Sequence, residues 1–181
     1  LIPGVHVWRP CDAVETLAAW LAAVGRSDGP SCLVLTRQNL PPQPPTATQL
    51  AQVARGSYVL ADDEHAPPDA VVIATGSEVA LAVAARSALA GQGIRLRVVS
   101  MPCIERFDAQ DAQYREAVLP AGIPRLAVEA GCTAHWYRLV GAGGRVIGID
   151  RFGESAPAPE LFKLFGFTAE NVVAAVRGLL G

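Results

Sequence analysis

The stretch Ala70-Val71-Val72-Ile73-Ala74-Thr75 is an unbroken apolar run that ends at the turn residues Gly76 and Ser77. A continuous apolar run of this length is typical of a strand that is buried on both faces, as strands of parallel sheets are. A helical pattern from about residue 78 to 89 follows, and Gly91 marks its end. Strand, turn and helix in this order predict an α/β fold.

The same alternation of strand and helix patterns continues to the C-terminus. Thr168 is the predicted N-cap of the last helix. Residues 56–181 are therefore predicted to form a three-layer α/β domain with a mostly parallel sheet of about five strands. The further strands are expected at residues 57–60, 94–101, 125–129 and 146–149, and the further helices at 108–118, 135–140, 158–165 and 168–180.

A shorter β-α-β unit is predicted before this domain, as the terminal piece (residues 1–40) of another α/β domain. Residues 5–8 and 32–35 have strand patterns, and strands joined in this way are normally parallel. Asp12 and Glu15 have the spacing of a capping box at the start of the intervening helix. The helix face expected to be buried consists of Val14, Leu17, Ala18 and Leu21.

A proline-rich segment follows this unit, with prolines at positions 41, 42, 44 and 45. Proline lacks the backbone N–H and fixes one backbone dihedral, so residues 41–55 are predicted to be an extended linker. This linker is the clearest domain boundary in the sequence.

Composition excludes several classes of partner. The chain has 181 residues, of which 51% are apolar and 18% charged, and its net charge is -2, so bulk charge attracts neither nucleic acid nor an anionic membrane. Charged residues such as Glu78 and Arg86 keep every apolar stretch well short of the ~20 residues that a membrane span needs. Because the chain starts at Leu1 and its single methionine is Met101, we expect it to be a piece of a longer protein.

The four cysteines lie far apart and form no C-x-x-C pair, so no metal site is expected. Cys32 and Cys103 lie in or beside apolar segments and are interpreted as small core residues. Unpaired cysteines indicate a reducing, cytoplasmic setting.

Arg37 is the strongest candidate for a binding residue. It follows the apolar run Cys32 to Leu35, and ligands of α/β sheets gather at the carboxyl ends of strands. Its planar guanidinium suits two-pronged binding of a phosphate or a carboxylate. An arginine paired with a carboxylate inside the fold explains the position equally well.

The turn Thr75-Gly76-Ser77-Glu78 leads from a strand into a helix N-terminus, where free N–H groups hold anions in some proteins. The interpretation we favour is an ordinary turn in which Ser77 caps the helix. A single glycine does not make a dinucleotide-binding loop, and Gly141-Ala142-Gly143-Gly144 is followed by a strand instead of the helix such a loop needs. A nucleotide-binding domain is therefore a weak alternative.

Glu129 and His135 are a candidate general acid–base pair. A strand-end carboxylate satisfied by backbone N–H groups is the alternative that we favour. His6 and His65 carry little signal. In the loop at residues 152–157, Glu154 is interpreted either as a contact to Arg151 or a partner chain, or as part of a surface turn.

Taken together, several short strings resemble those of transketolases, and they occur in family order over the whole chain. Each is weak alone, but the set is specific, and it resembles the end of the pyrimidine-binding domain followed by the C-terminal domain. The strings are Trp8-Arg9-Pro10-Cys11-Asp12, Thr36-Arg37-Gln38-Asn39-Leu40, Ile73-Ala74-Thr75-Gly76-Ser77-Glu78-Val79, Val99-Ser100-Met101-Pro102, Phe152-Gly153-Glu154-Ser155-Ala156-Pro157 and Leu164-Phe165-Gly166-Phe167-Thr168.

The resemblance implies transfer of a two-carbon ketol unit between sugar phosphates, with thiamine diphosphate and Mg²⁺ (or Ca²⁺), by a homodimer. It also implies that Arg37 binds the substrate phosphate, although Thr36 stands where many members carry serine. The family's metal ligands, diphosphate contacts and catalytic residues precede the position of Leu1. We therefore expect the piece alone to bind no thiamine diphosphate and to be inactive, with no catalytic residue of its own.

Other hypotheses stay open at this point. The chain could be a non-catalytic, dimer-forming structural module, because no acid–base constellation in it is stronger than its structural explanation. Deoxyxylulose-phosphate synthase and the β subunit of 2-oxo-acid dehydrogenases share the domain order. The strings at residues 36–40 and 152–157 point away from these two families.

Overall fold

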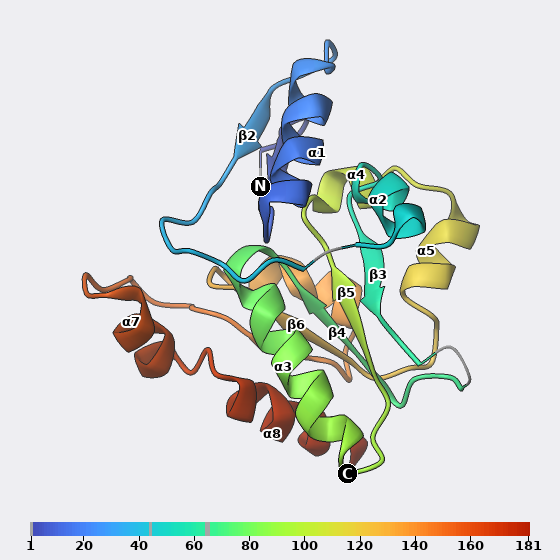
Figure 1. Ribbon diagram of the computed structural model, residues 1–181, viewed down its shortest axis with the longest axis vertical. Coiled ribbons are helices and arrows are strands. Elements are labelled where there is room, and N and C mark those ends of the chain that lie inside the picture. Colours follow the sequence, from blue (N-terminus) through green and yellow to red (C-terminus); the bar gives the residue numbers. More distant parts are fainter. Residues whose placement is uncertain (1, 44, 64–65) are drawn as a thin grey trace.

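The computed structural model describes residues 2–43, 45–63 and 66–181, so His65 lies outside the described residues (Figure 1). Two strands, β1 (His6–Trp8) and β2 (Ser31–Leu33), form a small parallel sheet with α1 (Ala13–Val24) between them. This β-α-β unit stands apart at the top of the view in Figure 1. The predicted unit and its parallel pairing are confirmed.

The second sheet has five strands in the order β3-β5-β4-β6-β7. β3 pairs antiparallel with β5, and the other pairs are parallel, as predicted for a mostly parallel sheet. All five residues of the central strand β4 are buried. The strands are β3 (Tyr58–Ala61), β4 (Ala70–Ala74), β5 (Leu96–Ser100), β6 (Arg125–Val128) and β7 (Arg145–Ile147).

Helices cover both faces of this sheet and make the predicted three layers. Val72 and Ala74 of β4 pack in one apolar cluster with α3 (Val79–Ala90) and α8 (Ala169–Leu180). Val71 and Ile73, which alternate with them along the strand, pack in a second cluster on the opposite face. The second cluster takes side chains from α4 (Ile104–Asp108), α5 (Ala112–Val118) and α6 (Tyr137–Val140).

Several local predictions need refinement. The helix expected over residues 108–118 is divided into α4 and α5, because Asp111 accepts a hydrogen bond from Tyr114 N and starts a new helix. α8 is capped by Thr168, as predicted. Three further helical elements of this domain are η1 (Gly76–Glu78), η2 (Ala134–Trp136) and α7 (Ala158–Phe165).

The predicted buried face of α1 is wrong. Leu17 and Leu21 are 62% and 68% exposed, whereas the residues buried on this helix are Glu15 and Ala19. Cys32, interpreted as a core residue, is exposed, and so are Val34 and Leu35. The reason is that β1 and β2 make a sheet of two strands, which is too narrow to cover the apolar surface on either side of it.

The expectation of an extended linker over residues 41–55 is wrong for its second half. Helix α2 (Ala47–Val53) occupies it, and Thr46 and Gln49 form a capping box at its start. The Gln49 side chain also donates to the carbonyl oxygens of Val59 and Leu60, each at 2.8 Å. The linker is thereby attached to the edge strand β3. In the described part of the chain, no helix is long and apolar enough to cross a membrane.

Candidate functional site

Arg37 lies in the loop of residues 34–43, four positions beyond the end of β2. Its side chain is exposed, and among the described residues no carboxylate pairs with it. The alternative of an arginine paired with a carboxylate inside the fold is therefore contradicted. Within the described ranges, its N–H donors have no hydrogen-bond partner and are available to a ligand.

This Arg37 loop (residues 34–43) is fastened to the β-α-β unit near its two ends. Val34 N donates to Trp8 O at 2.8 Å, which continues the pairing of β1 and β2. Gln43 N donates to Asp12 Oδ2 at 3.0 Å, at the start of α1. A cavity of about 360 Å³ lies between the loop and the first turn of α1.

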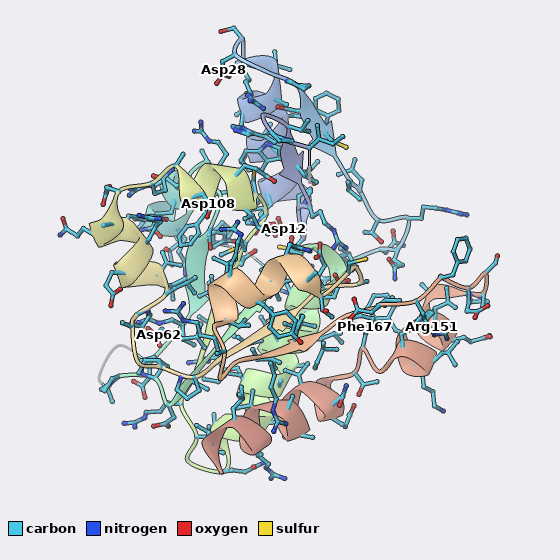
Figure 2. The ribbon with its side chains drawn as sticks, turned by 180° about the vertical axis from the view of Figure 1, so that it is seen from behind. Asp12, Asp28, Asp62, Asp108, Arg151 and Phe167 are labelled. Carbon is cyan, nitrogen blue, oxygen red and sulfur yellow. The ribbon has the colours of Figure 1, made fainter. Side chains whose placement is uncertain are left out.

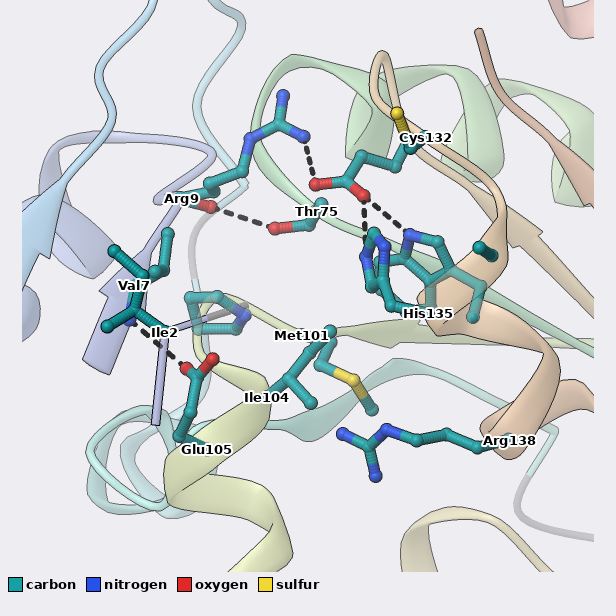
Figure 3. Close-up of a pocket in the computed structure, with 14 residues that line it drawn as sticks. Ile2, Val7, Arg9, Thr75, Met101, Ile104, Glu105, Cys132, His135 and Arg138 are labelled. Atoms are coloured by element: carbon teal, nitrogen blue, oxygen red, sulfur yellow. Dashed lines mark hydrogen bonds and ion pairs between the residues drawn. The ribbon is translucent and has the colours of Figure 1, made fainter. Parts of the chain in front are cut away.

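The candidate pair Glu129 and His135 does come together, at the carboxyl end of β6 (Figure 3). His135 Nε2 lies 2.9 Å from Glu129 Oε2, and Trp136 Nε1 donates to the same oxygen at 2.5 Å. Arg9 Nη1 donates to the other oxygen of Glu129. The carboxylate thus accepts from two side chains and contacts His135, and the interpretation that backbone N–H groups satisfy it is wrong.

Arg9 also joins a second acid, Glu78, in the turn between β4 and α3. Arg9 Nη2 lies 3.2 Å from Glu78 Oε2, which also accepts from Ala130 N at 3.0 Å. Burial raises the pKa of the Glu78 carboxyl, and the charge of Arg9 opposes that rise. Ser77 does not cap the helix as expected, because its hydroxyl donates to Glu78 Oε1 instead.

The guanidinium of Arg9 covers the turn that was a candidate for anion binding. A Cβ placed on Gly76 would lie 3.6 Å from Arg9 Nη2, and Gly76 N donates to Arg9 O at 2.9 Å. The space in front of the turn is thus taken by a residue of this chain. The geometry favours a joint between β1 and the larger sheet over a nucleotide site.

A cavity of about 440 Å³ lies beside this cluster, at the carboxyl ends of β4, β5 and β6 (Figure 3). Its wall is mostly apolar and includes Val7, Met101 and Ile104, and Arg138 lies on its far side. Arg138 is paired with Asp108 at 2.6 Å. Because Glu129 already accepts hydrogen bonds from Arg9 and Trp136, the cluster is better suited to holding the two sheets together than to moving a substrate proton.

Sequence reasoning missed Arg9 and Trp136 as partners of Glu129. Arg9 stands in the string Trp8-Arg9-Pro10, which is the one signal that could have found it.

The other candidate residues lie away from this cluster. Glu154 pairs with Arg151 at 2.8 Å on the surface, and the neighbouring Phe152 is 94% exposed. His6 lies in β1 and is partly buried, which lowers its pKa.

Two family models match this chain. Residues 56–168 match the transketolase-like C-terminal domain, and residues 1–43 match the transketolase pyrimidine-binding domain. The first match alone covers more than half of the 181 residues. The chain belongs to the transketolase family.

Curated transketolases match over the whole chain. Transketolase 2 of Pasteurella multocida is 56% identical over 99% of this chain, and transketolase 1 of Vibrio cholerae is 55% identical over 99%. The chain spans 27% of the length of either relative. It therefore corresponds to the C-terminal part of a transketolase.

Solved transketolases have the same fold. A Pichia stipitis transketolase in complex with sedoheptulose-7-phosphate superimposes with a TM-score of 0.90 at 41% identity, over 98% of this chain and 25% of that one. A split-gene transketolase, an inactive β4 tetramer, gives a TM-score of 0.77 at 25% identity, over 99% of this chain and 59% of that one. The mixed α/β fold of the transketolase C-terminal domain is thus confirmed.

The transketolase family and its pyrimidine-binding domain imply thiamine diphosphate in the complete protein. A bound diphosphate needs a divalent cation held by several oxygen ligands. Within the described ranges, no three His, Cys, Asp or Glu side chains lie together in a group that could hold a metal ion. The described residues of this chain therefore do not fit the metal–diphosphate part of the cofactor.

Proposed function

We propose that the complete protein transfers a two-carbon ketol unit between sugar phosphates, and that Arg37 of this chain binds the substrate phosphate. The observation that carries the proposal is an exposed arginine without a carboxylate partner among the described residues, inside a string that resembles the family's phosphate-binding string. The sugar-phosphate complex of the Pichia stipitis relative supports the substrate class.

The chemistry of Arg37 suits this role. A guanidinium presents parallel N–H donors that match two oxygens of a phosphate, and such charge-assisted bonds are stronger than neutral ones. An arginine already committed to a carboxylate would have to give up that partner first. Arg37 has no such cost within the described part of the chain.

The rest of the proposal concerns the complete protein. It includes Mg²⁺ (or Ca²⁺) beside thiamine diphosphate, a homodimer with the active site between its subunits, and a cytoplasmic location. The four free cysteines support a reducing compartment, because oxidising compartments favour disulfides. The proposal assigns to this chain substrate binding alone and no catalytic residue.

The test is steady-state kinetics of the complete enzyme with an Arg37→Ala substitution, with thiamine diphosphate and Mg²⁺ supplied. A hydrogen-bonded charge is worth about 1.5–3 kcal/mol, so kcat/KM for a phosphorylated ketose should fall about 10- to 150-fold. The kcat/KM for an unphosphorylated ketose should change little. Arg37→Lys keeps the positive charge but lacks the paired N–H donors of the guanidinium. Its kcat/KM for the phosphorylated ketose should lie between those of the wild type and Arg37→Ala.

Arg177→Ala is the matched control, because Arg177 is an exposed arginine of α8 that contacts Gln92. It should leave both substrates unaffected. Equal activity of wild type and Arg37→Ala toward the phosphorylated ketose would remove the phosphate role and keep the enzyme. Absence of ketol transfer in the complete wild-type protein would favour the structural-module hypothesis.

A further inference from the structure

The Arg37 loop has one hydrogen bond to another element beyond Val34. Among the described residues, the bond from Gln43 N to Asp12 Oδ2 alone joins residues 35–43 to the rest of the molecule. The other bonds of this segment are internal, such as those between Thr36 and Gln38. On the C-terminal side of Arg37, the loop is therefore anchored at Asp12.

Asp12 is held at the start of α1, where each of its carboxylate oxygens has a different task. Oδ1 accepts from Glu15 N at 2.9 Å and caps the helix, and Oδ2 accepts from Gln43 N at 3.0 Å. Figure 2 shows Asp12 at the junction between the β-α-β unit and the larger domain. One side chain thus connects the helix start to the end of the loop.

The start of α1 is in turn fixed to the larger domain by Glu15. This side chain is 1% exposed and accepts from Tyr58 OH at 3.0 Å and from Ser100 Oγ at 2.5 Å. Its other oxygen accepts from Cys11 N at 2.7 Å. Since Tyr58 lies in β3 and Ser100 in β5, the five-stranded sheet holds the helix start.

We propose that Asp12 is a positioning residue for Arg37: the C-terminal domain, acting through Glu15 and Asp12, holds the phosphate-binding loop in place. This inference rests on the proposed phosphate role of Arg37. According to this inference, the C-terminal domain supports substrate binding, although none of its own residues contacts the substrate. A loosened loop has to be ordered when the phosphate binds, and that ordering cost weakens binding.

The sharpest test changes the donor and leaves Asp12 intact. In the complete enzyme, Gln43→Pro removes the N–H that Asp12 accepts, whereas Gln43→Ala keeps it. Loss of one hydrogen bond of this kind should raise KM for a phosphorylated ketose about 3- to 10-fold in Gln43→Pro, with kcat little changed. Gln43→Ala and the KM for an unphosphorylated ketose should stay at the wild-type values.

A second variant changes the acceptor of the same hydrogen bond, Asp12, instead of the donor, Gln43. Asp12→Ser keeps a helix cap, because serine is a good N-cap residue, but its short side chain cannot serve Gln43 as well. It should repeat the KM effect of Gln43→Pro. Thr168→Ala, which removes the cap of α8, controls for a general loss of helix stability and should leave KM unchanged.

The outcomes separate this inference from the proposed function. Wild-type KM values in both Gln43→Pro and Asp12→Ser, together with a phosphate-specific loss in Arg37→Ala, would overturn the positioning role alone. An equal rise of KM in Gln43→Ala and Gln43→Pro would also overturn it, because the N–H would not be responsible. A missing phosphate-specific loss in Arg37→Ala would instead overturn the proposed function.

Discussion

Helices α1 and α3 have the same length, 12 residues, but they are buried very differently. α3 lies on the five-stranded sheet and also packs against α8, and the side chains that it buries are those of Val79, Ala82, Ala85 and Leu89. α1 lies beside two strands, and its exposed apolar side chains are those of Leu17, Trp20, Leu21 and Val24. The surface that is available to a helix therefore decides how much of its apolar face is buried.

The two helices also differ in what holds them. α3 is held by apolar contacts with the sheet and with α8, whereas α1 is held at its start by the hydrogen bonds of the buried Glu15. The chain spans about a quarter of its curated relatives' length, and we expect the complete protein to cover the exposed face of α1. Four sets of measurements test this difference.

The largest difference is expected in hydrogen exchange. Core amides exchange through openings that cost most of the global stability, whereas weakly packed elements open at lower cost. Amides of β4 and β5 should exchange at least about 100-fold more slowly than those of α1 and β2, which corresponds to about 2.7 kcal/mol. Mass spectrometry of exchanged peptides measures this, and equal protection before Pro41 and after Gly56 would contradict it.

The second difference is expected in the free energy of unfolding, when a leucine is replaced by alanine in each of the two helices. Leu89 is fully buried on α3, so Leu89→Ala should lower the free energy of unfolding by about 3 kcal/mol through lost contacts and a cavity. Leu21→Ala on α1 should change it by less than about 0.5 kcal/mol. Urea denaturation measures both. In the complete protein Leu21→Ala should become costly, and a neutral effect there would mean that nothing covers this face.

The smallest expected effects concern Glu15. Glu15→Ala leaves the hydroxyls of Tyr58 and Ser100 without their acceptor and should cost about 2 kcal/mol in the free energy of unfolding. Glu15→Gln should cost less, because its amide oxygen can accept from Cys11 N and the two hydroxyls can turn to accept from its amide group.

The pH dependence of stability tests the buried state of Glu15. Burial raises the pKa of this carboxyl in the folded protein, so the folded state binds its proton more tightly than the unfolded chain does. Its stabilising contribution is full below the unfolded pKa and is lost as pH rises through the folded pKa. The stability of the wild type minus that of Glu15→Gln should fall over this window. Parallel pH profiles of the two proteins would contradict the assignment.

Most of the larger domain could be predicted from its sequence, because its three central strands, β4, β5 and β6, are mostly buried. β4 was predicted from an unbroken apolar run, and the structure places it at residues 70–74 in the centre of the sheet. Helix α7 lies at the predicted residues 158–165. Here the local pattern and the tertiary environment agree, so the pattern is sufficient.

The β-α-β unit shows why the rest could not be predicted. The spacing of Val14, Leu17, Ala18 and Leu21 is that of an amphipathic helix, but a pattern does not reveal whether a sheet is present to cover it. The predicted capping box is half right: Asp12 caps the helix, but the Glu15 side chain bonds to Cys11 N, Tyr58 and Ser100 instead. The last two contacts span 43 and 85 positions, beyond the reach of local spacing.

In the candidate sites too, features that depend on nearby residues could be predicted, and contacts between distant positions could not. Arg37 was found because an arginine that follows an apolar run is a local feature; the strand ends earlier than predicted, at Leu33, and the phosphate role of Arg37 stays a prediction. The contact of Glu129 with His135 was also found locally, whereas Arg9 lies 120 positions from Glu129 and was missed. Asp12 was identified as a helix cap, but its second bond, to Gln43, needed the folded chain.

The attachment of α2 to the sheet has a consequence for the solubility of the protein. An exposed edge strand offers unpaired backbone groups to other molecules and can start fibril growth. At the β3 edge, Gln49 occupies the carbonyl groups of Val59 and Leu60, and the strand register shifts between Val59 and Ala61. The opposite edge strand, β7, has three residues. The segment with α2 therefore protects the β3 edge of the sheet from intermolecular strand addition, which is independent of any part in binding.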